Sequence, residues 1–311
     1  MRRCRYWMVP ALMLFFVCGL FGQEPARYAL VIGNADYDDL GSLKNPINDA
    51  QNPNGALRLY ESMGFQVDRL TNADLVAMEE AVARFRNRLS VDRESMGIFY
   101  YAGHGVQSGG QNFLIPSGAR IPSESYLRQR SFSVQILMDE LKTTRNFLNI
   151  IILDACRDNP FGWSRSANRG LSVVSSQPAG SIVVYATSAG SVAQDGDGRN
   201  GLFTSQLLEH LDTPGIEVED VFKRTGAAVR DRSNGDQLPA IYNQFFGDAY
   251  LVGRAGTRPG PSAGFGDADT AATGADTGPP GGVAAAADER TSAGDTVSGR
   301  FTSAERASRN S

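Results

Sequence analysis

Runs of apolar residues without polar alternation are the clearest pattern along this 311-residue chain. Such runs are typical of strands that are buried on both faces, as in parallel sheets covered by helices. Between them lie longer segments with helical periodicity, so strand and helix signals alternate. The expected strands span 28–33, 65–70, 97–101, 149–153, 181–186 and 249–252, and the expected helices span 53–63, 74–89, 133–143, 202–211 and 218–232.

This alternation predicts an α/β fold with a mostly parallel central sheet of about six strands, flanked by helices on both faces. Asn72, Ser133 and Asn200 precede three of the helices and are expected to cap them. Residues 111–116 are expected to form a small hairpin arm. No internal repeat is visible, so the sequence favours one folded domain.

The two ends of the chain differ from the middle. Residues 1–22 carry Arg2, Arg3 and Arg5, then an uncharged stretch that is short for a membrane span, and then Gly22. This layout predicts a signal peptide and export to the periplasm or the medium; an uncleaved anchor is the alternative. Residues 254–311 contain no Leu, Ile, Met, Trp or Tyr, so we expect a disordered tail behind a domain at 23–253.

Cysteine usage and net charge limit the classes of function and partner that the sequence favours. Cys4 and Cys18 lie in the expected leader, which leaves Cys156 without an internal disulfide partner. The formal net charge of −4 becomes −7 when the three leader arginines are lost. An acidic domain disfavours nucleic acid and anionic membranes as partners, so membrane contact is expected only through an uncleaved leader.

Two strand ends carry candidate chemistry. Cys156 follows the apolar run 149–153, and His104, one of two histidines, follows the run 97–102. In open α/β sheets functional residues collect where parallel strands end, and a thiol beside an imidazole suggests a cysteine nucleophile with a histidine partner. The glycines around His104 leave the Gly105 N–H uncovered for an oxyanion, with the Cys156 N–H as second donor. A buried, inert cysteine is the alternative interpretation.

Three sequence blocks, in register on the expected strands, resemble the caspase superfamily and specifically its bacterial metacaspase and paracaspase-like members. His104 precedes Cys156 by 52 residues, close to the caspase interval. The resemblance implies a caspase-hemoglobinase-like fold over about 27–253 and a cysteine endopeptidase with a His104–Cys156 dyad. The blocks are Tyr28-Ala-Leu-Val-Ile-Gly-Asn34, Tyr100-Tyr-Ala-Gly-His-Gly105 and Leu153-Asp-Ala-Cys-Arg-Asp-Asn-Pro-Phe161.

Substrate preference is predicted from Asp154, two residues before Cys156. A buried carboxylate is stabilised by a cation and destabilised by another anion, so the pocket should accept Arg or Lys in protein or peptide substrates. The resemblance adds Asp49 and Asp195 as further acidic candidates, although Asp49 could instead cap a helix and Asp195 could be a solvated turn residue.

Basic specificity would allow the enzyme to cut its own chain after the nucleophile. Arg165 and Arg169 lie in a segment rich in Gly, Ser and Asn. We therefore expect self-cleavage at one of them. A homodimer is left open by the sequence.

No cofactor is expected. Residues 196–201 satisfy the G-x-G-x-x-G pattern, but they begin several residues past the nearest expected strand and include Asp197 where a pyrophosphate would lie. One mature cysteine and two histidines cannot build a zinc cluster, and calcium activation stays open without support. Two rival functions remain: an Asp-specific peptidase of the same fold, and a catalytically idle caspase-like domain that binds partners.

Overall fold

The computed structural model describes residues 24–51, 55–156, 177–188 and 198–253, and for Leu57 and Cys156 it describes the backbone alone. The expected signal peptide (1–22) and tail (254–311) lie outside these residues. No helix within the described ranges is long and apolar enough to span a membrane.

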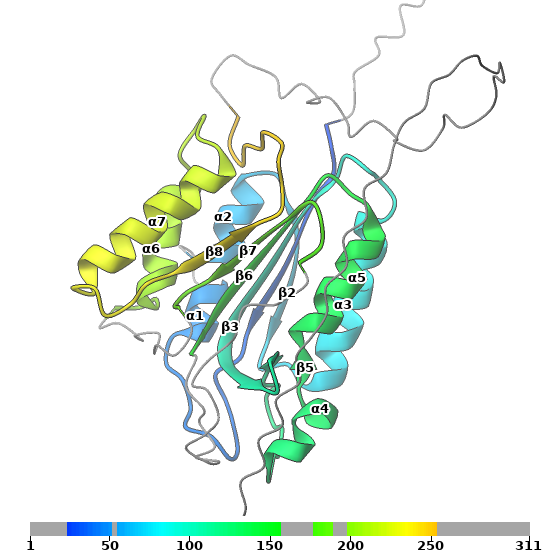
Figure 1. Cartoon of the computed structure of the whole chain (residues 1–311), viewed down its shortest axis with the longest axis vertical. Coiled ribbons are helices and arrows are strands. Elements are labelled where there is room, and N and C mark those ends of the chain that lie inside the picture. The colour runs from blue at the N-terminus through cyan, green and yellow to red at the C-terminus, as the bar shows by residue number, and fades with distance from the viewer. Residues whose placement is uncertain (1–23, 52–54, 157–176, 189–197, 254–311) are drawn as a thin grey trace, which may run out of the picture. The chain divides into compact units, whose positions relative to one another are not determined.

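A central sheet of six strands, in the order β2-β1-β3-β6-β7-β8, forms the middle layer (Figure 1). All neighbouring strands in it run parallel except β7 and β8, which are antiparallel. The predicted α/β fold with a mostly parallel sheet is therefore confirmed. The strands span β1 (Arg27–Gly33), β2 (Gln66–Thr71), β3 (Met96–Ser108), β6 (Leu148–Cys156), β7 (Ser181–Tyr185) and β8 (Ala240–Asn243).

Helices cover both faces of the sheet (Figure 1). One face carries α1, α2, α6 and α7, and the other carries α3 and α5. Short α4 (Leu127–Arg130) and the 3₁₀ turn η1 (Glu124–Tyr126) follow the hairpin region. The longer elements span α1 (Pro46–Gln51), α2 (Ala56–Ser62), α3 (Leu75–Leu89), α5 (Val134–Thr144), α6 (Leu202–Leu211) and α7 (Val218–Arg232).

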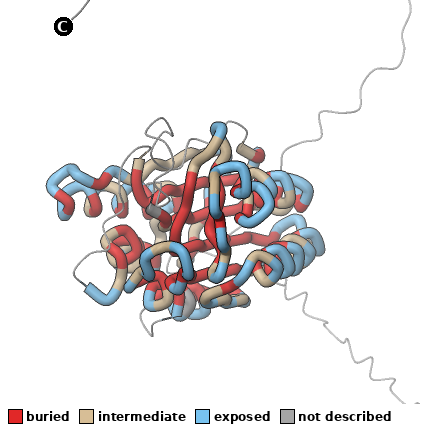
Figure 2. The backbone as a smooth tube through the Cα atoms, turned by 90° about the horizontal axis from the view of Figure 1, so that it is seen from below, coloured by how far each residue is buried: buried red, intermediate tan, exposed pale blue. Residues whose placement is uncertain are grey.

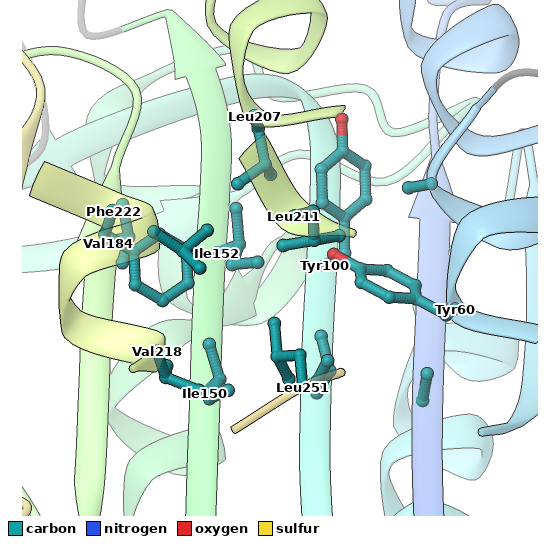
Figure 3. Packing of buried hydrophobic residues seen from close by; sticks show 14 of the residues in the cluster. Tyr60, Tyr100, Ile150, Ile152, Val184, Leu207, Leu211, Val218, Phe222 and Leu251 are labelled. Carbon is teal, nitrogen blue, oxygen red and sulfur yellow. The ribbon is translucent and has the colours of Figure 1, made fainter. Parts of the chain in front are cut away.

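The central strands are buried on both sides, as their unbroken apolar runs predict (Figure 2). Side chains alternate along each strand, so Ile150 and Ile152 join one core cluster while Ile151 and Leu153 join the other. In the first cluster Tyr100 of β3 packs among residues of α2 and α6, including Tyr60 and Leu207 (Figure 3).

A small antiparallel extension follows His104. Strand β3 continues past the parallel sheet and pairs with β4 (Gln111–Leu114), which pairs with β5 (Phe132–Ser133). This confirms the hairpin arm expected at 111–116. A third apolar cluster, which includes Tyr37, Val106 and Phe113, lies under this arm.

The last expected strand was wrong. Residues 249–252 make one isolated bridge, between Tyr250 and Glu217, and the edge strand is instead β8, at 240–243. The 249–252 segment is held irregularly: Ala249 accepts a hydrogen bond from Val218, and the Leu251 carbonyl accepts one from the Arg27 guanidinium. Apolar residues alone could not distinguish this packed segment from a strand.

Two expected caps were also wrong. Asp74, not Asn72, caps α3 by accepting a hydrogen bond from the Ala77 N–H at 2.8 Å. Asn72 instead adopts a left-handed backbone (φ 49°) in the preceding turn. Gly201, not Asn200, is the N-cap residue of α6. Ser133 is the N-cap residue of α5, as expected, but its side chain makes no capping hydrogen bond.

Candidate active site

The carboxyl ends of β3 and β6 bring the two predicted catalytic residues into register. His104 and Cys156 are the last of nine residue pairs between these parallel strands. Adjacent strands lie about 4.8 Å apart, so the two backbones are direct neighbours. Gly97 and Asn149 are paired near the start of the same ladder, and the register continues unbroken to the histidine and the cysteine.

The His104 imidazole is held in one orientation by a backbone carbonyl. The side chain is 9% exposed, and its Nε2 lies 2.9 Å from the Gly41 carbonyl oxygen. A carbonyl only accepts hydrogen bonds, so Nε2 carries the proton in the neutral ring and Nδ1 carries the lone pair. The Gly41 carbonyl therefore fixes the tautomer of the neutral histidine.

Two tyrosines surround the His104 backbone. The Tyr37 ring lies 4.6 Å from the imidazole between centroids, and its hydroxyl accepts from the His104 N–H and donates to the Asn34 carbonyl, both at 3.0 Å. The Tyr101 hydroxyl lies 2.9 Å from the His104 carbonyl oxygen. Burial raises the pKa of Tyr101, and the neighbouring Tyr37 raises it further, so Tyr101 stays a neutral donor.

Gly103 is required by this arrangement. A Cβ at this position would lie 2.6 Å from both the Tyr101 and Tyr37 hydroxyl oxygens. The glycine before the histidine therefore provides space for two phenols, in addition to the bending freedom expected from sequence.

Asn34 fixes the loop that supplies Tyr37 and Gly41. Its fully buried amide donates to the Ala73 and Ile115 carbonyls at 3.2 and 3.3 Å and accepts from the Ala73 N–H at 2.9 Å. The segments after β1, β2 and β4 are thus bonded to one side chain. Each of these bonds restrains the loop over the histidine.

The Gly105 N–H points away from the hairpin arm. The Ile115 N–H donates to the His104 carbonyl at 3.0 Å, and Gly105 pairs with Leu114. Because bonded and non-bonded pairs alternate in an antiparallel ladder, the Gly105–Leu114 pair is a non-bonded one. Its N–H is therefore not used by β4.

Asp49 and Asp154 converge on the start of α6. A Cβ built on Gly201 would lie 3.4 Å from Asp49 Oδ2 and 3.6 Å from Asp154 Oδ2. The Gly201 N–H also donates to Asp49 Oδ1 at 3.1 Å. Asp49, 2% exposed on α1, thus caps a helix, but it caps α6 and not its own neighbour in sequence.

A hydrogen-bond relay reaches Asp154 from the core. Thr204 Oγ1 donates to Asp154 Oδ2 at 2.6 Å, and the Tyr100 hydroxyl lies 2.6 Å from Thr204 Oγ1. A threonine has one hydroxyl proton, so Tyr100 must donate to Thr204. Burial raises the pKa of Tyr100 well above its usual value, and the charges of Asp49 and Asp154 raise it further.

Sequence reasoning identified part of this site. His104 and Cys156 come together, as do Asp49 and Asp154, whereas Asp195, Arg165 and Arg169 lie outside the described residues. It missed the supporting residues Tyr37, Gly41, Tyr100, Gly201 and Thr204. The position of Thr204 on the same helix face as Leu207 and Leu211 was the one signal that could have been noticed.

The part of the chain that the structure describes contains no group of three or more His, Cys, Asp or Glu side chains that could hold a metal ion. The groups around His104 are a backbone carbonyl that accepts and phenol hydroxyls, and hydrogen-bond donors around Asp154 and Asp49 come from α6. The candidate site thus combines a thiol-bearing residue, an imidazole and two carboxylates.

Comparison with known proteins agrees with this geometry. A family model described as the caspase domain matches residues 26–250. The human mucosa-associated lymphoid tissue lymphoma translocation protein 1 is 30% identical over 189 residues, and its mouse homolog is 31% identical over 196 residues. These alignments cover 60% and 61% of this chain but 22% of either relative, so the chain spans about a fifth of their length. Because the family model covers most of the chain, the resemblance seen in the three sequence blocks is confirmed, and the chain belongs to the caspase-domain family.

Proposed function

We propose that this domain is a cysteine endopeptidase that uses a His104–Cys156 dyad and cleaves after Arg or Lys. The observation that carries the proposal is the register of β3 and β6, in which His104 and Cys156 are neighbours at the carboxyl edge of the sheet. A thiol nucleophile needs a nearby base, and the imidazole is the side chain best suited to move a proton near neutral pH.

The reaction follows from the tautomer of His104. Nδ1 takes the Cys156 proton while Nε2–H stays bonded to the Gly41 carbonyl. The thiolate attacks the scissile carbonyl, and the oxyanion accepts hydrogen bonds from the Gly105 and Cys156 N–H groups. The imidazolium then protonates the leaving amine, and a water activated by the neutral ring hydrolyses the thioester, which returns the proton to the thiol.

Basic specificity is supported by the two carboxylates beside Gly201. Asp49 and Asp154 each border the same point, and hydrogen-bond donors from the start of α6 bind both carboxylates. An incoming guanidinium or ammonium would gain two attractive charges, whereas an aspartate would meet two repulsive ones. This argument disfavours the Asp-specific alternative.

The idle-domain alternative is weakened by the support around His104. A binding module needs neither a fixed imidazole tautomer nor a glycine that makes room for two tyrosine hydroxyls behind it. Several buried groups serve the orientation of this one ring. Such an arrangement is what general acid–base catalysis requires.

Cleavage of matched fluorogenic peptides tests the proposal. Four substrates would differ only at the residue before the scissile bond: Arg, Lys, citrulline and Asp. We expect cleavage of the Arg and Lys peptides, much weaker cleavage of citrulline, and none of Asp, with all activity lost in Cys156→Ala. Preferred cleavage of the Asp peptide would support the rival specificity, and no cleavage by folded protein would support the idle domain.

Self-cleavage at Arg165 or Arg169 is part of the same proposal. Both residues lie outside the described residues, so the argument rests on the sequence and on basic specificity. Intact masses of wild type and Cys156→Ala after incubation would differ by cleavage at one of these arginines. Identical masses would remove self-cleavage from the account.

The proposal needs no cofactor, because side chains and backbone amides supply every group in the reaction. We also propose that the protein is exported and acts on protein or peptide substrates with basic residues, as its leader-like first 22 residues and acidic pocket suggest. Rates measured with a chelator and with added calcium would test the first point. A strict calcium requirement would contradict it.

A further inference from the structure

We infer that Thr204, supported by Tyr100, is a positioning residue that orients the Asp154 carboxylate for a planar guanidinium. The inference rests on the proposed basic specificity of the site. It is carried by the two short hydrogen bonds of the relay, from the Tyr100 hydroxyl to Thr204 Oγ1 and from Thr204 Oγ1 to Asp154 Oδ2, each 2.6 Å.

The relay starts from two buried side chains and ends at a partly exposed carboxylate. Tyr100 and Thr204 are fully buried, whereas Asp154 is partly exposed. In Figure 3 the Tyr100 ring lies against β3 with its hydroxyl beside the helix that carries Leu207. A partly exposed carboxylate can rotate toward water, and a buried donor at Oδ2 restrains this rotation.

The start of α6 donates hydrogen bonds to both carboxylates, Asp49 and Asp154. The Gly201 N–H binds Asp49 Oδ1, and three residues later the Thr204 hydroxyl binds Asp154 Oδ2. The start of α6 therefore fixes the relative orientation of two carboxylates that come from α1 and β6. The two donors also stabilise two negative charges at one site, which like-charge repulsion would otherwise oppose.

Orientation matters more for arginine than for lysine. A guanidinium forms parallel hydrogen bonds to a carboxylate in a fixed plane, whereas an ammonium acts as a compact point charge. Loss of the Thr204 donor should therefore reduce Arg cleavage more than Lys cleavage. A general loss of folded protein would reduce both equally.

The test is steady-state cleavage of the Arg and Lys peptides by Thr204→Val, Thr204→Ser and Tyr100→Phe. In Thr204→Val we expect KM for the Arg peptide to rise about tenfold with kcat little changed, since a hydrogen bond to a charged group is lost. KM for the Lys peptide should rise by less than about threefold. Thr204→Ser keeps the donor and should restore KM, and Tyr100→Phe should raise KM about threefold because the charged bond remains.

Thr225→Val is the matched control. Thr225 is also a fully buried threonine, but its hydroxyl donates to the Val221 carbonyl within α7, away from the carboxylates. This variant reports the cost of losing any buried threonine hydroxyl and should leave both KM values unchanged.

If the ratio of KM for the Arg peptide to KM for the Lys peptide is unchanged in folded Thr204→Val, the inference is overturned while basic specificity stays intact. If wild type itself cleaves neither peptide, the proposed function is contradicted, and so is the inference that rests on it.

Discussion

The surroundings of His104 and of the Asp49–Asp154 pair differ in the kind of hydrogen-bond partner that they supply. Around His104, the described partners are a backbone carbonyl at Gly41 and the hydroxyls of Tyr37 and Tyr101, all neutral groups. Around the two aspartates, the partners are donors from the start of α6. The difference fits the proposed mechanism, in which the histidine changes its charge during the reaction while the two carboxylates keep their negative charge.

The two regions also differ in the elements that assemble them. The tyrosines that hold His104 lie on β3 itself, three residues away, and in the loop after β1, 67 residues away in sequence. The acidic pair depends on contacts across 152 and 50 residues of sequence, to Gly201 and Thr204. We therefore expect substitutions at the first region to change kcat and substitutions at the second to change KM and selectivity.

The largest effect should come from Cys156→Ala, which removes the nucleophile of the proposed mechanism. We expect kcat for the Arg peptide to fall by on the order of 10⁴-fold or more, as when a covalent nucleophile is removed from other peptidases. Binding of an Arg peptide should persist, because the acidic pocket is unchanged. A variant with full activity would exclude Cys156 as the nucleophile.

Asp154→Asn should weaken the preference for arginine over citrulline without disturbing the histidine. Asparagine keeps an oxygen to accept the Thr204 proton but removes the charge. We expect kcat/KM for the Arg peptide to fall about 100-fold, since one partner of a charge pair is lost, with little change for the citrulline peptide.

Asp68→Asn is the control, because Asp68 lies on β2 in a surface ion pair with Arg88 at 3.1 Å. Surface pairs contribute little, so its activity should match wild type. Equal losses with Arg and citrulline in Asp154→Asn would argue against a role for Asp154 in selectivity.

Two glycines allow a stability comparison between the regions. Gly103→Ala would push a Cβ to 2.6 Å from two tyrosine oxygens, so we expect about 2 kcal/mol or more loss in the free energy of unfolding. Gly201→Ala has ordinary contacts, at 3.4 and 3.6 Å, and a φ of −58°, so it should fold normally. Its methyl group would instead crowd the carboxylates and raise KM for the Arg peptide. Thermal unfolding followed by peptide kinetics separates the two effects.

Tyr37→Phe should give the smallest effect. It removes the hydroxyl that accepts from the His104 N–H and donates to the Asn34 carbonyl, while keeping the ring against the imidazole. We expect kcat to fall up to tenfold at unchanged KM, as the loss of about 1 kcal/mol of hydrogen bonding predicts. Tyr250→Phe changes a partly exposed tyrosine whose hydroxyl lies 3.4 Å from Glu217 Oε1, and as the control it should leave kcat unchanged.

The sequence predicted five of the six strands of the central sheet, and the long apolar runs of β3 and β6 predicted the strand ends that carry His104 and Cys156. It proposed these two residues as partners, but it could not predict that they are paired in the ladder, which depends on the register between strands distant in sequence. Nor could it predict that Gly201 and Thr204 would meet Asp49 and Asp154, since no local pattern encodes a contact between a helix start and a strand end.

The errors in the predicted helix caps and in the predicted edge strand have a similar cause. Asn72 and Asp74 are both good capping residues, and only the backbone distinguishes them: Asn72 is left-handed in the turn, and Asp74 is extended at the cap. The edge strand β8 at 240–243 was overlooked because its four residues are only partly buried and show no apolar run. Intermediate burial at a sheet edge weakens the hydrophobic signal on which strand prediction depends.

Covalent labelling tests the central claim most directly. Wild type and Cys156→Ala would be incubated with an Arg-chloromethylketone peptide, and modified peptides would be identified by mass spectrometry. The account predicts one adduct at Cys156 in wild type, protection by excess Arg peptide, no adduct in the variant, and no labelling by the corresponding Asp reagent. Labelling that is independent of Cys156, or faster with the Asp reagent than with the Arg reagent, would contradict a basic-specific peptidase built on the His104–Cys156 pair.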